Sequence, residues 1–250
     1  MAPEWGSACA RRDGGALAVE TGDGLFFIML TKETIEANLS GIQQRIREAA
    51  ERAGRGPEEV RLVAVTKSVD SSAVRALCEL GVTHIGENRV QVAEEKVRAL
   101  SDAPICWHMV GHIQRRKAKD VLALFDKVDS VDRMRLAREL QKRCEESERQ
   151  ADILAEVNVS GEEAKHGFAP AALKDTLAEL AGLDRLNVRG LMTMAPFGAE
   201  ESVLRQVFGT LRRLAHDHGL PEVSMGMTDD FEVAIEEGAT EVRIGRALFV

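Results

Sequence analysis

The chain has 250 residues, of which 44% are hydrophobic and 30% charged, and its formal net charge is −8. These values are typical of a globular protein with one large domain or two small ones, and the acidic balance argues against a nucleic-acid-binding protein. The four cysteines form no CxxC pair and no apolar run is long enough to span a membrane, so we expect no zinc or disulfide framework, no membrane partner and a cytoplasmic location.

The first thirty residues differ from the rest of the chain. Residues 1–23 are rich in glycine, alanine and mixed charge without a period, and the apolar stretch 24–30 is short. A secretory signal has a basic start, an apolar middle and a small-residue cleavage site, an order that is not found here. We therefore expect a poorly ordered N-terminal extension at 1–30.

From residue 31 the pattern becomes regular. Thr31 is suited to be the N-cap of a long helix, in which apolar residues recur at helical spacing from Ile35 onward and which Gly54 ends. Strands are expected at 61–66, 82–86, 105–110, 127–131, 153–159, 188–193, 222–225 and 241–245. Further helices are expected at 71–80, 87–100, 111–125, 132–149, 170–180, 200–218 and 228–237, two of them capped by Asp132 and Thr228.

Strand and helix alternate strictly over residues 31–250. This alternation predicts a parallel sheet, and eight such units in one chain favour closure into a single-domain (β/α)8 barrel, the TIM-barrel fold. In barrels of this kind, ligands bind at the carboxyl ends of the strands. The residues at those ends therefore carry the functional prediction.

Lys67 stands at the carboxyl end of the first strand, after an apolar run. A lysine there is either an ordinary exposed charge or an amine that forms a Schiff base with a carbonyl compound. The other residues expected at the carboxyl ends of the strands, the mouth of the barrel, decide between these two interpretations.

The loops after the seventh and eighth strands hold a phosphate in many barrels. Here the first loop contains Ser224, Met225 and Gly226, and the second contains Gly245 and Arg246. Each has a glycine that lets backbone N–H groups approach an anion, and each leads into a helix N-terminus. Plain turn chemistry explains either loop alone, whereas the two together favour a phosphate site.

A phosphate on that side and an aldehyde at Lys67 describe the layout of pyridoxal 5'-phosphate (PLP). Arg243, near the end of the eighth strand, could then donate to the pyridine nitrogen, and Asn88, after the second strand, to the phenolic oxygen. A guanidinium disfavours protonation of the ring, which would then stabilise carbanions poorly. Alternatively, Arg243 belongs to an ion pair at the mouth and Asn88 caps a helix.

His108 and His112 have the H-x3-H spacing of a helical metal site. A predicted strand and Gly111 separate them, however, so they would not share one helical face. No metal site is predicted. The basic run at 115–119 is interpreted as a solvated helix face.

Seven short motifs between residues 31 and 249 are specific. They are VAVTK (63–67), GENRVQ (86–91), WHMVGHIQ (107–114), VNVSGEE (157–163), RGLMTMAP (189–196), SMGMTDD (224–230) and RIG (243–245). In these motifs the chain resembles the pyridoxal phosphate homeostasis proteins, also called the YggS or PROSC family, whose barrel is similar to the N-terminal domain of alanine racemases.

The resemblance implies PLP as a Schiff base on Lys67, with its phosphate on Ser224 and the backbone around Gly245 and Arg246, and with Arg243 at the ring nitrogen. It also implies a role in intracellular vitamin B6 homeostasis rather than a catalytic activity. In three places the chain departs from the family pattern. The arm at 1–30 is additional, Arg246 stands where a serine or threonine is common, and the end at residue 250 implies that a final helix is missing.

A racemase of this type needs a second acid/base group, which in alanine racemases is a tyrosine from another domain, and this chain contains no tyrosine. We therefore expect a PLP carrier or regulator without catalytic residues, with a racemase-like enzyme acting on amino acids as the alternative. The expected partners are PLP and PLP-dependent apoenzymes. A monomer is expected because the racemase's second domain is lacking.

Overall fold

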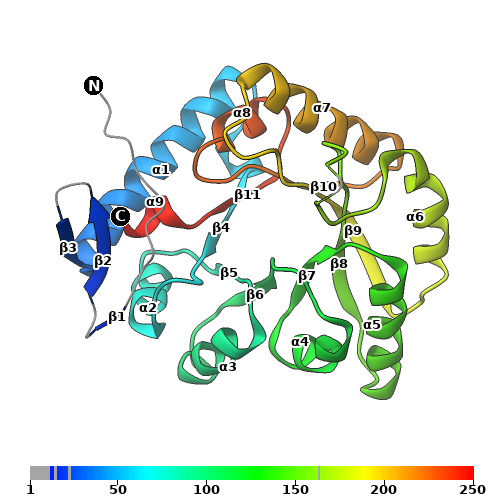
Figure 1. Ribbon diagram of the computed structural model, residues 1–250, viewed down its shortest axis with the longest axis horizontal. Helices are drawn as coiled ribbons and strands as arrows, with labels where there is room; N and C mark the ends of the chain where they lie inside the picture. The colour runs from blue at the N-terminus through cyan, green and yellow to red at the C-terminus, as the bar shows by residue number, and fades with distance from the viewer. Residues whose placement is uncertain (1–11, 14–15, 22–23, 163) are drawn as a thin grey trace.

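A computed structural model describes residues 12–13, 16–21, 24–162 and 164–250 (Figure 1). Its central feature is a closed barrel of parallel strands in the order β10-β11-β4-β5-β6-β7-β8-β9. These strands are β4 (Arg61–Val65), β5 (His84–Glu87), β6 (Cys106–Met109), β7 (Lys127–Val131), β8 (Ala151–Glu156), β9 (Leu186–Met192), β10 (Glu222–Ser224) and β11 (Glu241–Ile244). The barrel closes where β11 pairs with β4, with Arg243 beside Val63. The predicted (β/α)8 fold is confirmed.

The helices surround the strands, as Figure 1 shows. They are α1 (Lys32–Arg52), α2 (Ser71–Glu79), α3 (Val90–Ala99), α4 (Ala118–Leu124), α5 (Met134–Glu146), α6 (Leu173–Ala181), α7 (Glu201–Asp217), α8 (Phe231–Glu236) and α9 (Arg246–Phe249), with 3-10 turns η1 (Pro57–Glu59), η2 (Arg115–Lys117) and η3 (Pro170–Ala172). Each long helix buries an apolar stripe against the barrel, as α7 does with Leu204, Phe208 and Leu211.

The start of α1 shows how local signals set a boundary. Thr31 is the N-cap, and its side-chain oxygen accepts a hydrogen bond from the backbone N–H of Thr34 at 3.3 Å. Gly54, with φ of +67°, follows the C-cap Ala53 and ends the helix. Both predicted ends of this helix are confirmed.

Two other predicted N-caps are wrong. Asp230, not Thr228, is the N-cap of α8, and its carboxylate accepts the backbone N–H of Met227 at 2.6 Å in the turn before the helix rather than an N–H of the helix itself. Arg133, not Asp132, is the N-cap of α5, and the Asp132 carboxylate instead receives hydrogen bonds from the Arg133 guanidinium at 2.5 and 2.7 Å. Asp132 is thereby kept at the carboxyl end of the barrel.

A small antiparallel sheet precedes α1. It consists of β1 (Arg12–Asp13), β2 (Ala16–Thr21) and β3 (Gly24–Met29), and it is separate from the strands of the barrel (Figure 1). Residues 1–11, 14–15 and 22–23 lie outside the described residues. The division of the chain into a poorly ordered extension at 1–30 and a barrel at 31–250 therefore stays a prediction.

The inside of the barrel carries several buried charges. The ammonium group of Lys127 lies 2.5 Å from the carboxylate of Glu222 and 3.3 Å from that of Glu241. Burial opposes the ionisation of Glu241, but the cation of Lys127 prevails and lowers its pKa to about 2. Because a buried charge is tolerated only beside an opposite one, these pairs let the fold retain charged groups in its interior.

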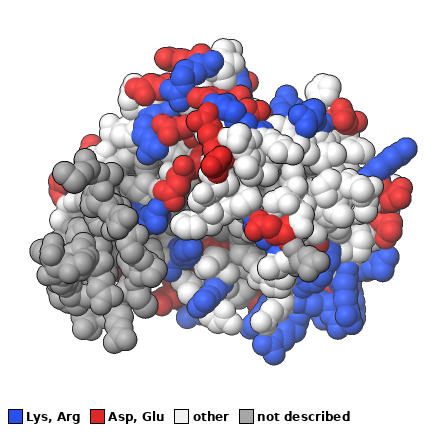
Figure 2. Space-filling view, turned by 45° about the horizontal axis from the view of Figure 1, so that its top comes forward, with Lys and Arg blue, Asp and Glu red and all other residues white. Residues whose placement is uncertain are grey.

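The surface gives less information about function. On the face shown in Figure 2, acidic and basic side chains are interspersed at the top and basic ones gather at the lower right, so this face carries no single continuous field of one sign. In the described part of the chain, no helix combines the length and the apolar character needed to cross a membrane.

Candidate cofactor-binding site

Lys67 lies in the turn after β4, with its side chain exposed at the mouth of the barrel. The preceding residue, Thr66, is buried: its hydroxyl donates to Glu87 Oε1 at 2.6 Å, and its carbonyl oxygen accepts from Lys96 Nζ at 2.6 Å. Lys96 and Glu87 also pair with each other at 2.5 Å. The turn is thus anchored from its buried side, while the Lys67 amine has no hydrogen bond or ion pair with any residue that the structure describes.

Asn88 follows β5, the strand next to β4. Its backbone approaches Gly111 so closely that a Cβ there would lie 2.6 Å from the Asn88 Cα, so only glycine fits. The Asn88 side chain is half-buried and, among the described residues, its amide has no hydrogen-bond partner. An amide positioned in this way is free to bind a ligand beside Lys67.

Arg243 lies inside the barrel on β11, on the other side of β4. Its Nη1 donates to Ser224 Oγ at 2.7 Å, and its Nη2 donates to the carbonyl oxygen of Thr193 at 2.9 Å. Burial lowers the pKa of this guanidinium below its ordinary value, and the nearby Glu241 carboxylate opposes the shift. These two bonds use only some of the guanidinium's N–H donors, so donors remain for a ligand atom in the mouth.

The loop after β10 only partly matches its prediction. The Ser224 hydroxyl is fully buried and donates to Glu241 Oε1 at 2.8 Å while it accepts from Arg243, so it is not presented to the mouth. Met225 is also buried. Gly226 has φ of +93°, and a Cβ there would lie 2.6 Å from the Cβ of Ala234, which explains the glycine.

The loop after β11 approaches β4 and the loop after β10. A Cβ on Gly245 would lie 3.2 Å from the carbonyl oxygen of Val65, so the glycine permits this close approach. Both carboxylate oxygens of Asp229 accept from Arg246 Nη2 at 2.8 Å. Arg246 therefore joins the two loops that were predicted to hold a phosphate, and it is exposed, so its guanidinium can exchange this partner for an anion.

The predicted residues come from four consecutive barrel strands, β10, β11, β4 and β5. The structure brings Lys67, Asn88, Arg243 and the two glycine loops to the carboxyl ends of these strands. The Ser224 hydroxyl and the Met225 side chain are turned away from the mouth. The candidate site is thus half of a barrel mouth, with the amine near its centre.

Sequence analysis missed the polar residues of the other half of the mouth. Asp132 follows β7, Glu156 ends β8, and the stacked rings of His112 and His166 have centroids 4.0 Å apart. His112 Nδ1 lies 3.1 Å from the Asp132 carboxylate. Their position at or just after strand ends was the available signal, because side chains at those positions face the mouth.

Glu156 is the most perturbed acid of this half. Burial raises its pKa to about 7, with a further increase from the nearby Asp132, while Arg243 and Arg133 act in the opposite direction. A carboxyl group with this pKa exchanges protons near neutral pH, so it can serve as an acid or a base.

His108 and His112 do not share a site. His108 lies inside the barrel, where its Nδ1 is 2.8 Å from Asp129 Oδ2, and His112 lies at the mouth beside Asp132. As predicted from the sequence, they do not share a face, because the end of a strand and Gly111 separate them.

Residues 37–250 match the family described as alanine racemase, N-terminal domain. The chain is 42% identical to a pyridoxal phosphate homeostasis protein of Aquifex aeolicus, over 84% of this chain and 95% of that protein. It is also 42% identical to the Pseudomonas aeruginosa protein of the same name, over 86% and 95% of the two chains. Among solved structures it is similar to PipY of Synechococcus elongatus PCC7942 with PLP bound, with a TM-score of 0.75, 32% identity and coverage of 86% and 100%. The chain therefore belongs to the alanine racemase N-terminal domain family and, within it, to the pyridoxal phosphate homeostasis proteins.

Proposed function

We propose that this chain binds PLP and acts in intracellular vitamin B6 homeostasis as a carrier or regulator of the cofactor. The observation that carries the proposal is the exposed amine of Lys67, without a partner among the described residues, on the strand that neighbours the buried Arg243. The names of the relatives and the PLP bound to PipY support it.

The residues of the mouth fit this cofactor. Its aldehyde supplies the covalent attachment, as a Schiff base with the Lys67 amine. Arg243 would donate to the ring nitrogen, and Asn88 to the phenolic oxygen. Arg246 and the backbone at Gly245 would bind the phosphate, for which Arg246 must leave Asp229. The proposed cofactor-binding residues are Lys67, Asn88, Ser224, Met225, Gly226, Arg243, Gly245 and Arg246, of which Ser224 and Met225 would contribute their backbone, because their side chains are buried away from the mouth.

The surroundings of Arg243 favour holding the cofactor over using it. A guanidinium is a donor without an acceptor, so Arg243 would disfavour protonation of the ring nitrogen and leave the ring a weak electron sink. The Lys67 turn is anchored from its buried side, while the lysine side chain itself is exposed and without a partner among the described residues. Both features suit reversible storage of an aldehyde. We further propose that the protein delivers PLP to apoenzymes, that it is located in the cytoplasm and that it is a monomer.

The test is borohydride reduction of the purified protein after incubation with PLP, followed by peptide mapping by mass spectrometry. We expect a reduced pyridoxyl group on Lys67 and weak, non-covalent binding in Lys67→Ala. Lys165→Ala is the matched control, because Lys165 lies on another loop of the mouth, 3.4 Å from the carbonyl oxygen of Met194. An adduct on another lysine, or equal affinity in Lys67→Ala and the original chain, contradicts the proposal.

The alternative is a racemase-like enzyme acting on amino acids, and one observation favours it. Glu156, with its pKa raised to about 7 by burial, stands at the half of the mouth opposite Lys67 and could replace the missing tyrosine as a second acid/base group. Incubation of the PLP-loaded protein with single L-amino acids in deuterated water tests this. Incorporation of deuterium at Cα that disappears in Glu156→Gln would favour the enzyme, and no incorporation favours the carrier.

A further inference from the structure

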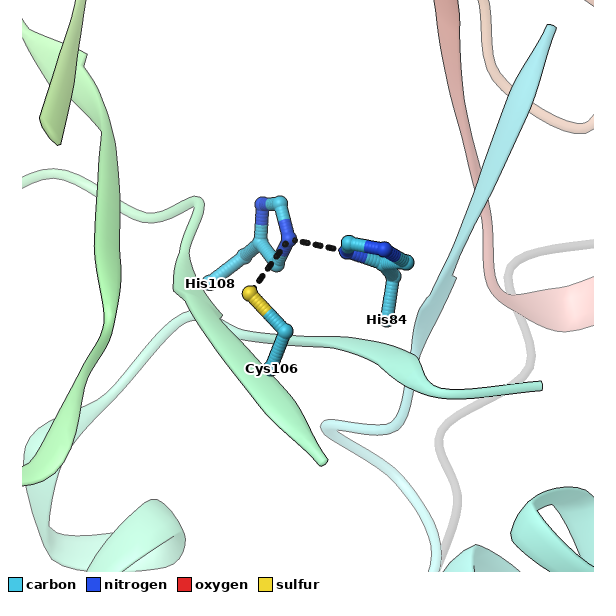
Figure 3. A group of neighbouring side chains, drawn as sticks. All are labelled: His84, Cys106 and His108. Carbon is cyan, nitrogen blue, oxygen red and sulfur yellow. Dashed lines mark hydrogen bonds between the residues drawn. The ribbon is translucent and has the colours of Figure 1, made fainter. Parts of the chain in front are cut away.

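The opposite end of the barrel holds a cluster that the proposed function does not use. His84 is the first residue of β5 and Cys106 the first residue of β6, and the two are paired in the sheet register. His108 follows Cys106 by two residues and therefore points to the same face of β6. Figure 3 shows the two imidazole rings turned toward each other with the Cys106 sulfur beside them.

The ligand atoms of this cluster converge. His84 Nδ1 lies 2.9 Å from His108 Nε2, and the Cys106 Sγ lies 3.6 Å from the same His108 nitrogen. The three ligand atoms all lie within 4.8 Å of one another. Bond lengths of about 2.0–2.1 Å to nitrogen and about 2.3 Å to sulfur place the ligands of a tetrahedral zinc ion roughly 3.3–3.6 Å apart. A shift of a few tenths of an ångström between the two rings thus admits the ion.

We propose that His84, Cys106 and His108 form a zinc site at the amino ends of the barrel strands. Two imidazoles and one thiolate are the borderline-soft donor set that Zn²⁺ prefers over the oxygen donors suited to Mg²⁺ or Ca²⁺. On binding, the ion takes the place of the hydrogen-bonded proton between the two rings, and both this proton and the thiol proton of Cys106 are released to solvent.

A second layer of contacts fixes His108 for this role. Its Nδ1 lies 2.8 Å from Asp129 Oδ2, and both side chains are fully buried. With Nδ1–H donating to that carboxylate, the Nε2 lone pair is directed at the cluster, the arrangement found behind many metal-binding histidines. The second oxygen of Asp129 has no hydrogen bond among the described residues and lies 3.8 Å from Lys127 Nζ.

The site also has room and access. His84 and Cys106 are only half-buried, and a cavity of about 450 Å³ lies against His84, with Arg61 and Thr83 also in its wall. Two carboxylates lie near His108, and both have partners: Asp129 binds His108 Nδ1, and Glu241 is held by Ser224 at 2.8 Å and by Lys127 at 3.3 Å. Three protein ligands with the fourth position left to water are therefore expected, rather than a closed four-ligand site.

The site is independent of the cofactor proposal, because it lies at the opposite ends of the strands from Lys67. The test is titration of the metal-stripped full-length chain with Co²⁺, a spectroscopic substitute for Zn²⁺, followed by competition with Zn²⁺. Difference spectra against the same protein without Co²⁺ cancel any cofactor absorbance. We expect one equivalent of Co²⁺ with a sulfur-to-cobalt charge-transfer band, and its displacement by one equivalent of Zn²⁺.

Three variants make the result specific. Cys106→Ser should abolish the charge-transfer band and weaken Zn²⁺ binding by at least tenfold, and His84→Gln should weaken it by a similar factor. Cys78→Ser, which changes a half-buried cysteine of α2, is the matched control and should bind like the original chain. Each variant is checked for its unfolding midpoint. The proposal is overturned if Co²⁺ fails to bind, or if the spectrum and affinity of Cys106→Ser equal those of Cys78→Ser in folded protein.

Discussion

The ionisation of Glu156 gives a sharp test of the structure of the mouth. Its carboxyl group ends β8, is almost fully buried, and faces Asp132, Arg133 and Arg243. Burial, followed by the charge of Asp132, raises its pKa from the ordinary 4.5 to about 7. The substitution Glu156→Gln keeps the size of the side chain and removes its charge.

The magnitude follows from the linkage between protonation and folding. Below pH 4.5 the carboxyl group is protonated in both the folded and the unfolded chain, so it contributes no pH dependence. As the pH rises through 4.5 the unfolded chain ionises first, which destabilises the folded state until the pH exceeds about 7. The full effect of such a shift is about 3 kcal/mol above pH 8 and less than about 1 kcal/mol at pH 5. The original chain should therefore lose stability as the pH rises, and Glu156→Gln should become more stable relative to it.

The assay is urea unfolding of the cofactor-free protein at pH 5 and pH 8, for the original chain and for Glu156→Gln. A buried amide without a full set of partners lowers the stability of the variant by a similar amount at both pH values, so the difference between them, about 2 kcal/mol, is the readout. Glu95→Gln, on the exposed face of α3, is the control and should show no such difference. Equal effects of Glu156→Gln at the two pH values would refute the argument that this carboxyl group is held uncharged.

Two further substitutions test the loops and the packing. Asp229→Asn weakens the hold on Arg246 and removes a negative charge beside the proposed phosphate. PLP affinity in a spectroscopic titration should therefore rise by about fivefold, corresponding to about 1 kcal/mol. Unchanged or weaker binding would exclude Arg246 as a phosphate ligand. Gly190→Ala should lower the free energy of unfolding by about 3 kcal/mol, because its Cβ would lie 2.6 Å from a backbone carbon of β10. Gly41→Ala is the matched control: nothing lies within 4 Å of its Cβ, and it should stabilise α1 by about 0.5–1 kcal/mol, an opposite sign that unfolding experiments resolve easily.

The barrel could be predicted from the sequence because its information is local. Alternation of apolar strands with amphipathic helices specifies a parallel sheet, and caps such as Thr31 specify where helices begin. The prediction failed where tertiary contacts override local pattern. The stretch at 111–114, expected to be helical, forms no helix, and there the carbonyl oxygen of Gly111 accepts from the Ser130 hydroxyl and that of Ile113 from the Arg133 guanidinium. With those carbonyls bound elsewhere, α4 begins only at Ala118.

The candidate site could be predicted only in part, for a similar reason. Lys67 and Asn88 were recognised because each follows a strand closely. The proposed zinc ligands could not be predicted, because His84 and Cys106 are distant in sequence and meet only through the pairing of β5 with β6. A pattern such as H-x3-H detects ligands on one helix, whereas the floor of a barrel draws single residues from several strands. Sheet register, which the sequence does not fix by itself, decides which of them meet.

The Ser224 hydroxyl is part of a chain of hydrogen bonds that runs from the mouth of the barrel toward its opposite end. It accepts from Arg243, which is the proposed partner of the cofactor ring, and donates to Glu241, whose other oxygen binds Lys127. Each member of this chain is buried and satisfied by the next, so loss of one leaves its neighbours with unpaired charge or hydrogen-bonding groups. The orientation of Arg243 at the mouth therefore depends on carboxylates near the floor as well as on the ligand. Arg243, the proposed partner of the cofactor ring, is thus positioned by buried groups beneath the mouth, whereas the exposed Lys67, which would hold the cofactor, has no partner among the described residues.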